Sequence, residues 1–92
     1  MNQGGSDREL RLRQRLESRF APSVLVIKDE SRLHAGHAGA AAGHGHFRIR
    51  IVAEAFRNVS PVARHRLVYA AVEDLLRTDI HALAIEASPP PA

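Results

Sequence analysis

Apolar residues recur every four positions near the N-terminus of the chain. Leu12, Leu16 and Phe20 follow one another at i, i+4 and i+8, and this spacing predicts a helix with one buried stripe. The S-x-x-E sequence that begins at Ser6 has the form of a capping box, so Ser6 is the expected N-cap. Pro22 is expected to end the helix, because proline cannot continue one.

Three later segments alternate apolar and polar residues as strands do. Residues 24–27 form a short run of Val, Leu and Ile bounded by turn-forming residues. In residues 46–51, Phe and Ile alternate with Arg, which is typical of a strand with one face exposed to water. Residues 80–87 alternate again, with His81 and Leu83 expected on one face.

A second helix is expected to begin where Ser60 precedes Pro61. Serine is a favoured N-cap, and proline is tolerated at the first helical position. Residues 54–59, just before this helix, are expected to hold a short helical turn. The apolar residues expected to form the buried stripe of the helix are Leu67, Val68, Ala71, Val72 and Leu75.

These elements occur in the order α-β-β-(α)-α-β, which predicts an α+β fold with helices packed on a three-stranded mixed sheet. The first two strands should pair as an antiparallel hairpin, whereas the helical connection makes the second and third strands parallel. The third strand then starts at the end of the sheet where the loop between the first two strands arrives. This topology brings His81 towards four histidines of the loop and the second strand, which are His34, His37, His44 and His46.

The length of 92 residues fits one domain. We expect this domain at residues 6–87, between a flexible N-terminus at residues 1–5 and a Pro-rich tail at residues 88–92. No apolar stretch approaches the ~18 residues of a membrane-spanning helix, and residues 1–10 lack the apolar run of a signal peptide. We therefore expect an intracellular, cytoplasmic protein.

The absence of cysteine limits the chemistry that this chain can perform. It excludes disulfides, thiol nucleophiles and thiolate metal sites made by this chain alone. Four of the six histidines lie between residues 34 and 46, in a Gly- and Ala-rich loop of a length typical of functional or disordered segments. Any metal would therefore be bound by histidine, by carboxylate or by a partner's sulfur.

The net charge of +3 allows a contact with phosphate or an acidic protein without requiring one. Arg64, His65 and Arg66 lie in the first turns of the second predicted helix, where cations oppose the helix dipole. An anion docking nearby would remove this penalty; alternatively, the arginines are solvated or paired with acidic side chains. Four arginines on one face of the first helix are expected to be solvated, namely Arg8, Arg11, Arg15 and Arg19.

The chain resembles the BolA family over about residues 8–87. The resemblance rests on the order and spacing of several segments, each of them weak alone. The family has a class II KH-like fold with the element order αββααβ, which agrees with the predicted topology. The matching segments are Asp29-Glu30-Ser31, His46-Phe47, residues 60–69 and Ile80-His81-Ala82-Leu83.

The resemblance implies a monothiol glutaredoxin as the partner in a heterodimer, with a 2Fe–2S cluster bridging the two proteins. One ligand of the family carries over to His81, and the other to the loop histidine His34, with His37 as the alternate loop ligand. His46 is expected to orient the loop without binding the metal. The glutaredoxin cysteine and a glutathione thiol would complete the ligands, in an arrangement that resembles a Rieske centre.

Catalysis is not expected, because the sequence has no nucleophile elbow, phosphate-binding glycine loop or HExxH motif. A zinc site at His34 and His37 would lack further anchoring ligands, which favours adventitious binding. The main alternative is a DNA-binding transcriptional regulator, since BolA relatives are also linked to transcriptional control. Such a regulator would use Arg57 and the Arg64-His65-Arg66 helix, although no GxxG loop joins the predicted helices as it does in KH domains.

Overall fold

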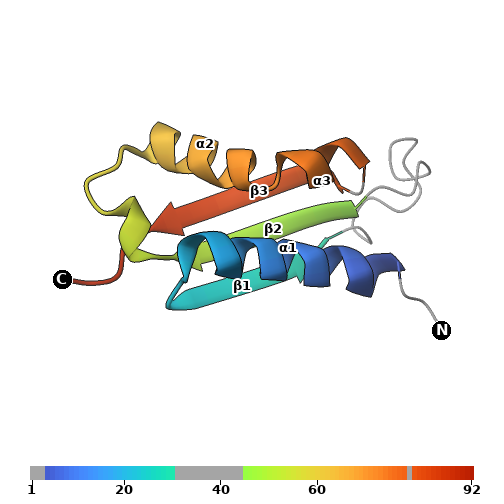
Figure 1. Ribbon diagram of the computed structural model, residues 1–92, viewed down its shortest axis with the longest axis horizontal. Coiled ribbons are helices and arrows are strands. Elements are labelled where there is room, and N and C mark those ends of the chain that lie inside the picture. The colour runs from blue at the N-terminus through green and yellow to red at the C-terminus, as the bar shows by residue number, and fades with distance from the viewer. Residues whose placement is uncertain (1–3, 31–44, 79) are drawn as a thin grey trace.

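The computed structural model describes residues 4–30, 45–78 and 80–92, and for residues 4–6 and 81 it describes the backbone alone (Figure 1). Within these ranges, no helix is long and apolar enough to span a membrane. The elements are α1 (Gly4–Phe20), β1 (Val24–Asp29), β2 (Gly45–Val52), the 3₁₀ turn η3 (Glu54–Phe56), α2 (Pro61–Ala71), α3 (Glu73–Thr78) and β3 (Ile80–Ser88).

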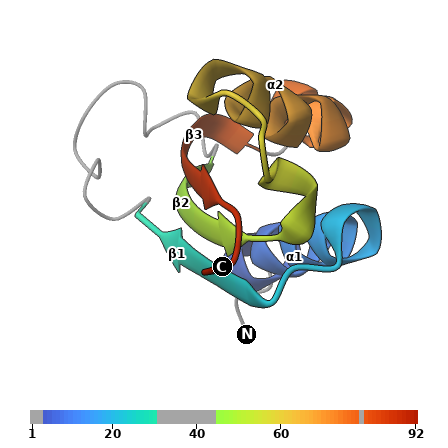
Figure 2. The same cartoon turned by 90° about the vertical axis from the view of Figure 1, so that its left-hand side faces the viewer.

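The three strands form one mixed sheet in the order β1-β2-β3. β1 and β2 are antiparallel, with Val24 opposite Val52, and β2 and β3 are parallel. The helices lie on one face of this sheet (Figure 2). The predicted α+β architecture and both strand orientations are therefore confirmed.

Apolar and charged residues alternate along β2, and the apolar side chains pack against the helices. Phe47, Ile49 and Ile51 are at most 2% exposed, whereas Arg48 and Arg50 between them are exposed. A strand places successive side chains on opposite faces, so one face of β2 is apolar and the other is charged. The helix layer contributes buried side chains from α1, η3, α2 and α3, which include Leu12, Leu16, Phe56, Val68, Val72 and Leu75.

The first helix starts earlier than predicted. α1 begins at Gly4, so Ser6 lies inside the helix and is not its N-cap. Its end agrees with the prediction, because Ala21 adopts a left-handed φ of 46° and Pro22 follows.

The second helix is interrupted, which the sequence pattern did not predict. At Val72 the backbone leaves helical geometry, with φ −121° and ψ 18°, and its N–H donates to the carbonyl of Tyr69. The buried residues nevertheless keep helical spacing across this break. Val68, Val72 and Leu75 are buried as predicted, but Leu67 is 36% exposed and lies outside the core.

One arginine of α1 joins the two helical segments of the chain. Arg15 donates to the carbonyl of Ala71 over 3.0 Å and, through Nη2, to Oδ2 of Asp74, also over 3.0 Å. The hydrogen bond from Arg15 lowers the pKa of Asp74 from 3.8 to about 2. Arg15 therefore crosslinks α1 to the α2–α3 junction, which corrects the expectation that it is only solvated.

Candidate functional site

The starts of β2 and β3 meet at one end of the sheet. Gly45 pairs with Ile80, but the next pair is His46 with Ala82, so His81 is an extra residue on β3. Such a β-bulge disrupts the ladder locally and often re-aims a side chain next to a functional site. It also explains why Ile80 and Leu83, three positions apart, are both buried. The regular alternation predicted for this strand is therefore wrong at His81.

β1 ends at this same end of the sheet. The N–H of Glu30 donates to the carbonyl of His46 over 2.7 Å. Glu30 and Gly45, the described residues on either side of 31–44, therefore both lie at the end of the sheet that holds the bulge. The predicted ligands His34 and His37 lie outside the described residues, as does the side chain of His81.

His46 is the second residue of β2, next to the bulge. It is partly buried, and its Nε2 atom is inaccessible to solvent. By register its side chain falls on the same face of β2 as Arg48, away from the buried Phe47. His46 is thus placed next to both ends of the segment 31–44, and the orienting role stays a prediction.

Gly45, at the first position of β2, is packed tightly against Phe47. A Cβ atom at Gly45 would meet Cε2 of the Phe47 ring at a separation that real Cβ atoms do not show. Phe47 is 2% exposed, so its ring has little room to move. A side chain at position 45 must therefore displace either the core or the start of β2.

We predict that Gly45→Ala lowers the free energy of unfolding by about 1–3 kcal/mol, because it overpacks the core beside the bulge. Urea denaturation of the isolated protein measures this loss. The double variant Gly45→Ala/Phe47→Leu should lose less than the sum of the two single variants, since the smaller side chain relieves the clash. Simple additivity would show that the contact with Phe47 is not the cause.

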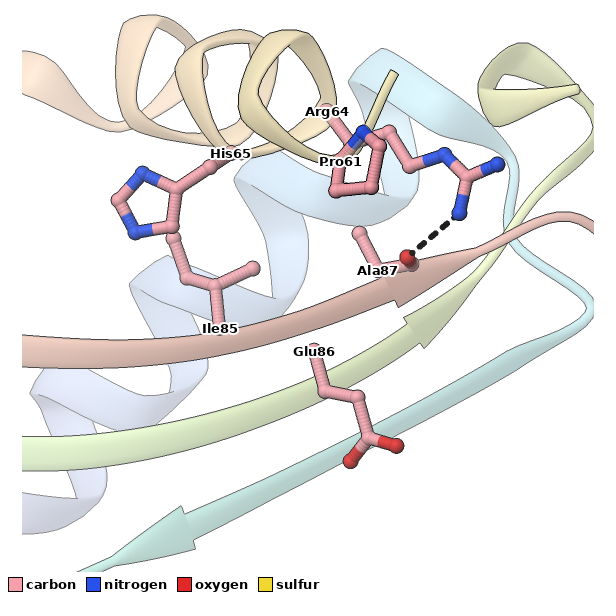
Figure 3. Close-up of a pocket in the computed structure, with 6 residues that line it drawn as sticks. All are labelled: Pro61, Arg64, His65, Ile85, Glu86 and Ala87. Atoms are coloured by element: carbon pink, nitrogen blue, oxygen red, sulfur yellow. Dashed lines mark hydrogen bonds between the residues drawn. The ribbon is translucent and has the colours of Figure 1, made fainter. Parts of the chain in front are cut away.

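Arg64 connects two parts of its own chain. Its Nε donates to the carbonyl of Phe56 over 3.1 Å, and its Nη1 donates to the carbonyl of Ala87 over 3.3 Å (Figure 3). The first carbonyl belongs to the η3 turn and the second to the end of β3. Arg64 therefore holds the C-terminal end of the sheet against the turn that precedes α2.

Arg57, which follows the η3 turn, also bonds to its own chain. It forms an ion pair with Glu54 and donates through Nη2 to the carbonyl of Pro90 over 2.8 Å. The hydrogen bond from Arg57 lowers the pKa of Glu54. Arg57 thus pairs with an acidic side chain. Arg64, for which such pairing was the alternative expectation, bonds to carbonyls instead.

The other two residues of the predicted arginine site face outward. His65 is exposed and stacks on Tyr69 with 4.5 Å between ring centroids. The hydroxyl of Tyr69 donates to the carbonyl of Leu83 over 3.1 Å, which ties α2 to β3. Arg66 is exposed on α2. His65 and Arg66 are thus the members of this group whose side chains are accessible to a partner.

The arginine group and the histidine group lie at opposite ends of β3. Arg64 contacts Ala87, whereas His81 lies near the start of the strand. At ~3.3 Å per residue, these two positions are about 20 Å apart. One small ligand cannot contact both groups, but one protein partner can.

We predict that Arg64→Ala lowers the free energy of unfolding by about 1–3 kcal/mol, because two carbonyls lose a charged donor. Arg66→Ala is the matched control and should change stability by less than about 0.5 kcal/mol, because Arg66 is exposed. Urea denaturation of both variants measures the difference. Equal stabilities would contradict the clamping role of Arg64.

The donor types of this chain limit the kind of metal centre that it could share. The described residues contain no group of three or more His, Asp or Glu side chains that could hold an ion. The chain has no cysteine, so it can offer imidazole nitrogens but no thiolate. This donor set fits the histidine half of a Rieske-like 2Fe–2S centre, with the thiolates supplied by another molecule.

Residues 16–91 of the chain match the BolA-like protein family. This chain belongs to the BolA family. It is 44% identical over 88 residues to SufE-like protein 1 of Arabidopsis thaliana, covering 90% of this chain and 24% of that protein. The solved BolA domain of that protein superposes with a TM-score of 0.80 at 42% identity, covering 90% of this chain and 92% of the domain.

Two further BolA relatives have different descriptions. BolA-like protein 1 of Mus musculus is 42% identical over 82 residues, covering 89% of this chain and 58% of the relative. The DNA-binding transcriptional regulator BolA of Vibrio cholerae is 39% identical over 74 residues, covering 80% of this chain and 67% of the relative. The chain thus spans a quarter to about three fifths of the first two relatives. The Arabidopsis relative is described as chloroplastic or mitochondrial, and the cytoplasmic location of this chain stays a prediction.

Proposed function

We propose that this BolA-family protein is a non-enzymatic partner of a monothiol glutaredoxin and helps it to hold a 2Fe–2S cluster. The observation that carries the proposal is the β-bulge at His81. It lies beside the residues where the segment containing His34 leaves and rejoins the sheet. Two imidazoles distant in the sequence therefore belong to segments that are anchored at one edge.

In this proposal each ligand has a defined source. His81 and His34 supply imidazole nitrogens, with His37 as the alternate loop ligand, and His46 orients the loop. The thiolates come from the glutaredoxin cysteine and from glutathione, because this chain has none. When bound, the cluster supplies an iron–sulfur unit for transfer to other proteins or for sensing of iron and redox state.

The proposal is tested by co-purifying the chain with the monothiol glutaredoxin of its host in the presence of glutathione, iron and sulfide. We expect a one-to-one heterodimer whose visible circular dichroism spectrum differs from that of the glutaredoxin homodimer. Histidine ligation on one iron is the physical reason for the difference. A spectrum identical to that of the glutaredoxin alone, at saturating amounts of this chain, would reject the proposal.

The second candidate function is DNA binding, and the description of the Vibrio cholerae relative as a DNA-binding regulator supports it. The accessible side chains for such a contact are His65 as a hydrogen-bond donor and Arg66 as a cation, because Arg57 and Arg64 bond to their own chain. Each phosphate contact contributes a salt dependence of about 0.9 log unit per tenfold change in salt. Titration of duplex DNA at several salt concentrations would show this slope, and Arg66→Ala would reduce it by about one contact.

A further inference from the structure

The sheet has a second face that no described element covers. The helices lie on the opposite face, as the end view shows (Figure 2). In the close-up, Glu86 points from β3 to the side away from α2 (Figure 3). We call this surface the open face and define it by six exposed side chains that point away from the helices, which are Val24, Val26, Lys28, Arg48, Arg50 and Glu86.

Three cations are concentrated on two neighbouring strands of the open face. Lys28 is directly opposite Arg48 in the register, and Arg50 follows on the same side of β2. Like charges directly opposite each other destabilise a sheet. The pairing of Lys28 with Arg48 therefore does not stabilise the fold by itself, and an external anion beside these two cations would be favourable.

The carboxylates nearby balance the cations only in part. Glu30 accepts a hydrogen bond from Nε of Arg48 over 3.1 Å, and Glu86 is opposite Arg50 in the register. Among the described residues, no acidic side chain forms an ion pair with Lys28. The centre of the open face thus keeps an excess of positive charge.

The same residues surround a hollow in the surface. Its volume is about 210 Å³, and its lining consists of Val26, Lys28, Arg48, Arg50 and Glu86. Val26 is 39% exposed and gives the hollow an apolar wall beside the cations. This combination fits an acidic side chain of a protein, because its methylene groups contact the valine while its carboxylate reaches the cations.

The composition of the open face favours a protein partner over a single-stranded nucleic acid. Strand-binding sheets stack bases on exposed aromatic side chains. None of the described residues on the open face is Phe, Tyr or Trp, and Phe47 on β2 faces the core at 2% exposure. His46, which shares the face of Arg48, is partly buried, and its Nε2 atom is inaccessible to solvent. The cations are therefore arranged for carboxylates without a platform for bases.

The position of the open face connects it to the proposed site. In the β1–β2 ladder, the pair of Lys28 and Arg48 is followed by the pair of Asp29 and Phe47. This last pair lies near the end of the sheet where the bulge is found. We propose that the protein that shares the cluster docks on the open face through an acidic surface. This inference rests on the proposed function, because it assigns the docking surface for the same glutaredoxin.

The test compares the affinity of the host's monothiol glutaredoxin for the wild-type chain and for two charge reversals, Lys28→Glu and Arg50→Glu. Arg19→Glu is the matched control, because Arg19 is exposed on α1 in the helix layer. We expect each open-face reversal to weaken binding by on the order of tenfold at low salt and by less at high salt. The control should change it less than about twofold, which is typical of a distant charge.

Three further measurements make the outcomes distinct. The neutral variants Lys28→Gln and Arg50→Gln should weaken binding less than the reversals, and thermal melting shows that each variant is folded. At saturating glutaredoxin, all variants should give the same visible circular dichroism spectrum, since the proposed ligands are unchanged.

Affinities equal to that of Arg19→Glu, with a normal cluster spectrum, would overturn the open-face inference and leave the proposed function intact. Charge-dependent binding of the wild type without any histidine-type spectrum would support the docking surface and reject the proposed function. Tight binding of duplex DNA at physiological salt that both reversals abolish would also overturn the inference, because it would assign the open face to nucleic acid.

Discussion

Replacing His81 with alanine is expected to abolish the histidine-type visible circular dichroism spectrum of the glutaredoxin complex while the isolated domain remains folded. In the proposed complex His81 is the ligand from β3, and no cysteine in this chain can replace it. The buried neighbours Ile80 and Leu83 keep the start of β3 in place, so the fold should persist. Far-ultraviolet circular dichroism of the variant alone checks the fold, and the visible spectrum of the complex checks the ligand.

His65→Ala is the matched control for this experiment. His65 is exposed on α2 and stacks on Tyr69. It lies beside Ile85 and Ala87, towards the end of β3 opposite the bulge. At saturating glutaredoxin its replacement should leave the shape of the spectrum unchanged. An unaltered spectrum in the folded His81→Ala variant would remove His81 from the ligand set. The same measurement on His34→Ala and His37→Ala would identify the loop ligand, and we expect the loss with His34→Ala.

The architecture could be predicted from the sequence because each element has a strong local signal. The alternation of Phe47, Ile49 and Ile51 with arginines identified the face of β2 that packs against the helices. The helical connection between β2 and β3 then required parallel pairing, which placed His81 at the edge where the loop arrives. These steps depend on periodicity and topology alone.

The bulge at His81 could not be predicted in this way. A bulge inserts one residue without changing the residue types on either side, so the segment still looks like regular alternation. The three-residue spacing of the buried Ile80 and Leu83 is the trace that it leaves in the sequence. That spacing is ambiguous, because it also suits a helix.

The arginines show a second limit of sequence reasoning. The sequence does not distinguish Arg57 and Arg64 from the accessible Arg66. In the structure, however, Arg57 donates to the carbonyl of Pro90, and Arg64 donates to those of Phe56 and Ala87. These carbonyls are brought near only when the chain has folded. A count of basic residues therefore overestimates the cationic surface that a partner can reach.

Phe56→Ala is expected to cause the largest loss of stability. Phe56 is fully buried in the η3 turn, and its ring lies 5.1 Å from that of Phe20 at the end of α1. Removing a buried phenylalanine costs about 3–5 kcal/mol, because the cavity collapses only in part. A domain of this size has about 5–14 kcal/mol of total stability, so this loss is a large fraction of it. Thermal melting should show a decrease in the midpoint of more than about 15 °C.

Leu67→Ala is the matched control, since the sequence pattern placed Leu67 in the same core. The side chain is 36% exposed, whereas the buried residues Val68, Val72 and Leu75 follow one another at i, i+4 and i+7 and leave Leu67 at the margin of their stripe. Its removal leaves no closed cavity and should cost less than about 1 kcal/mol. Losses of similar size in the two variants would mean that Leu67 packs in the core. A small loss for Leu67→Ala beside a large one for Phe56→Ala would confirm that the core of this region is formed by Phe56 and by the stripe of Val68, Val72 and Leu75, with Leu67 outside it.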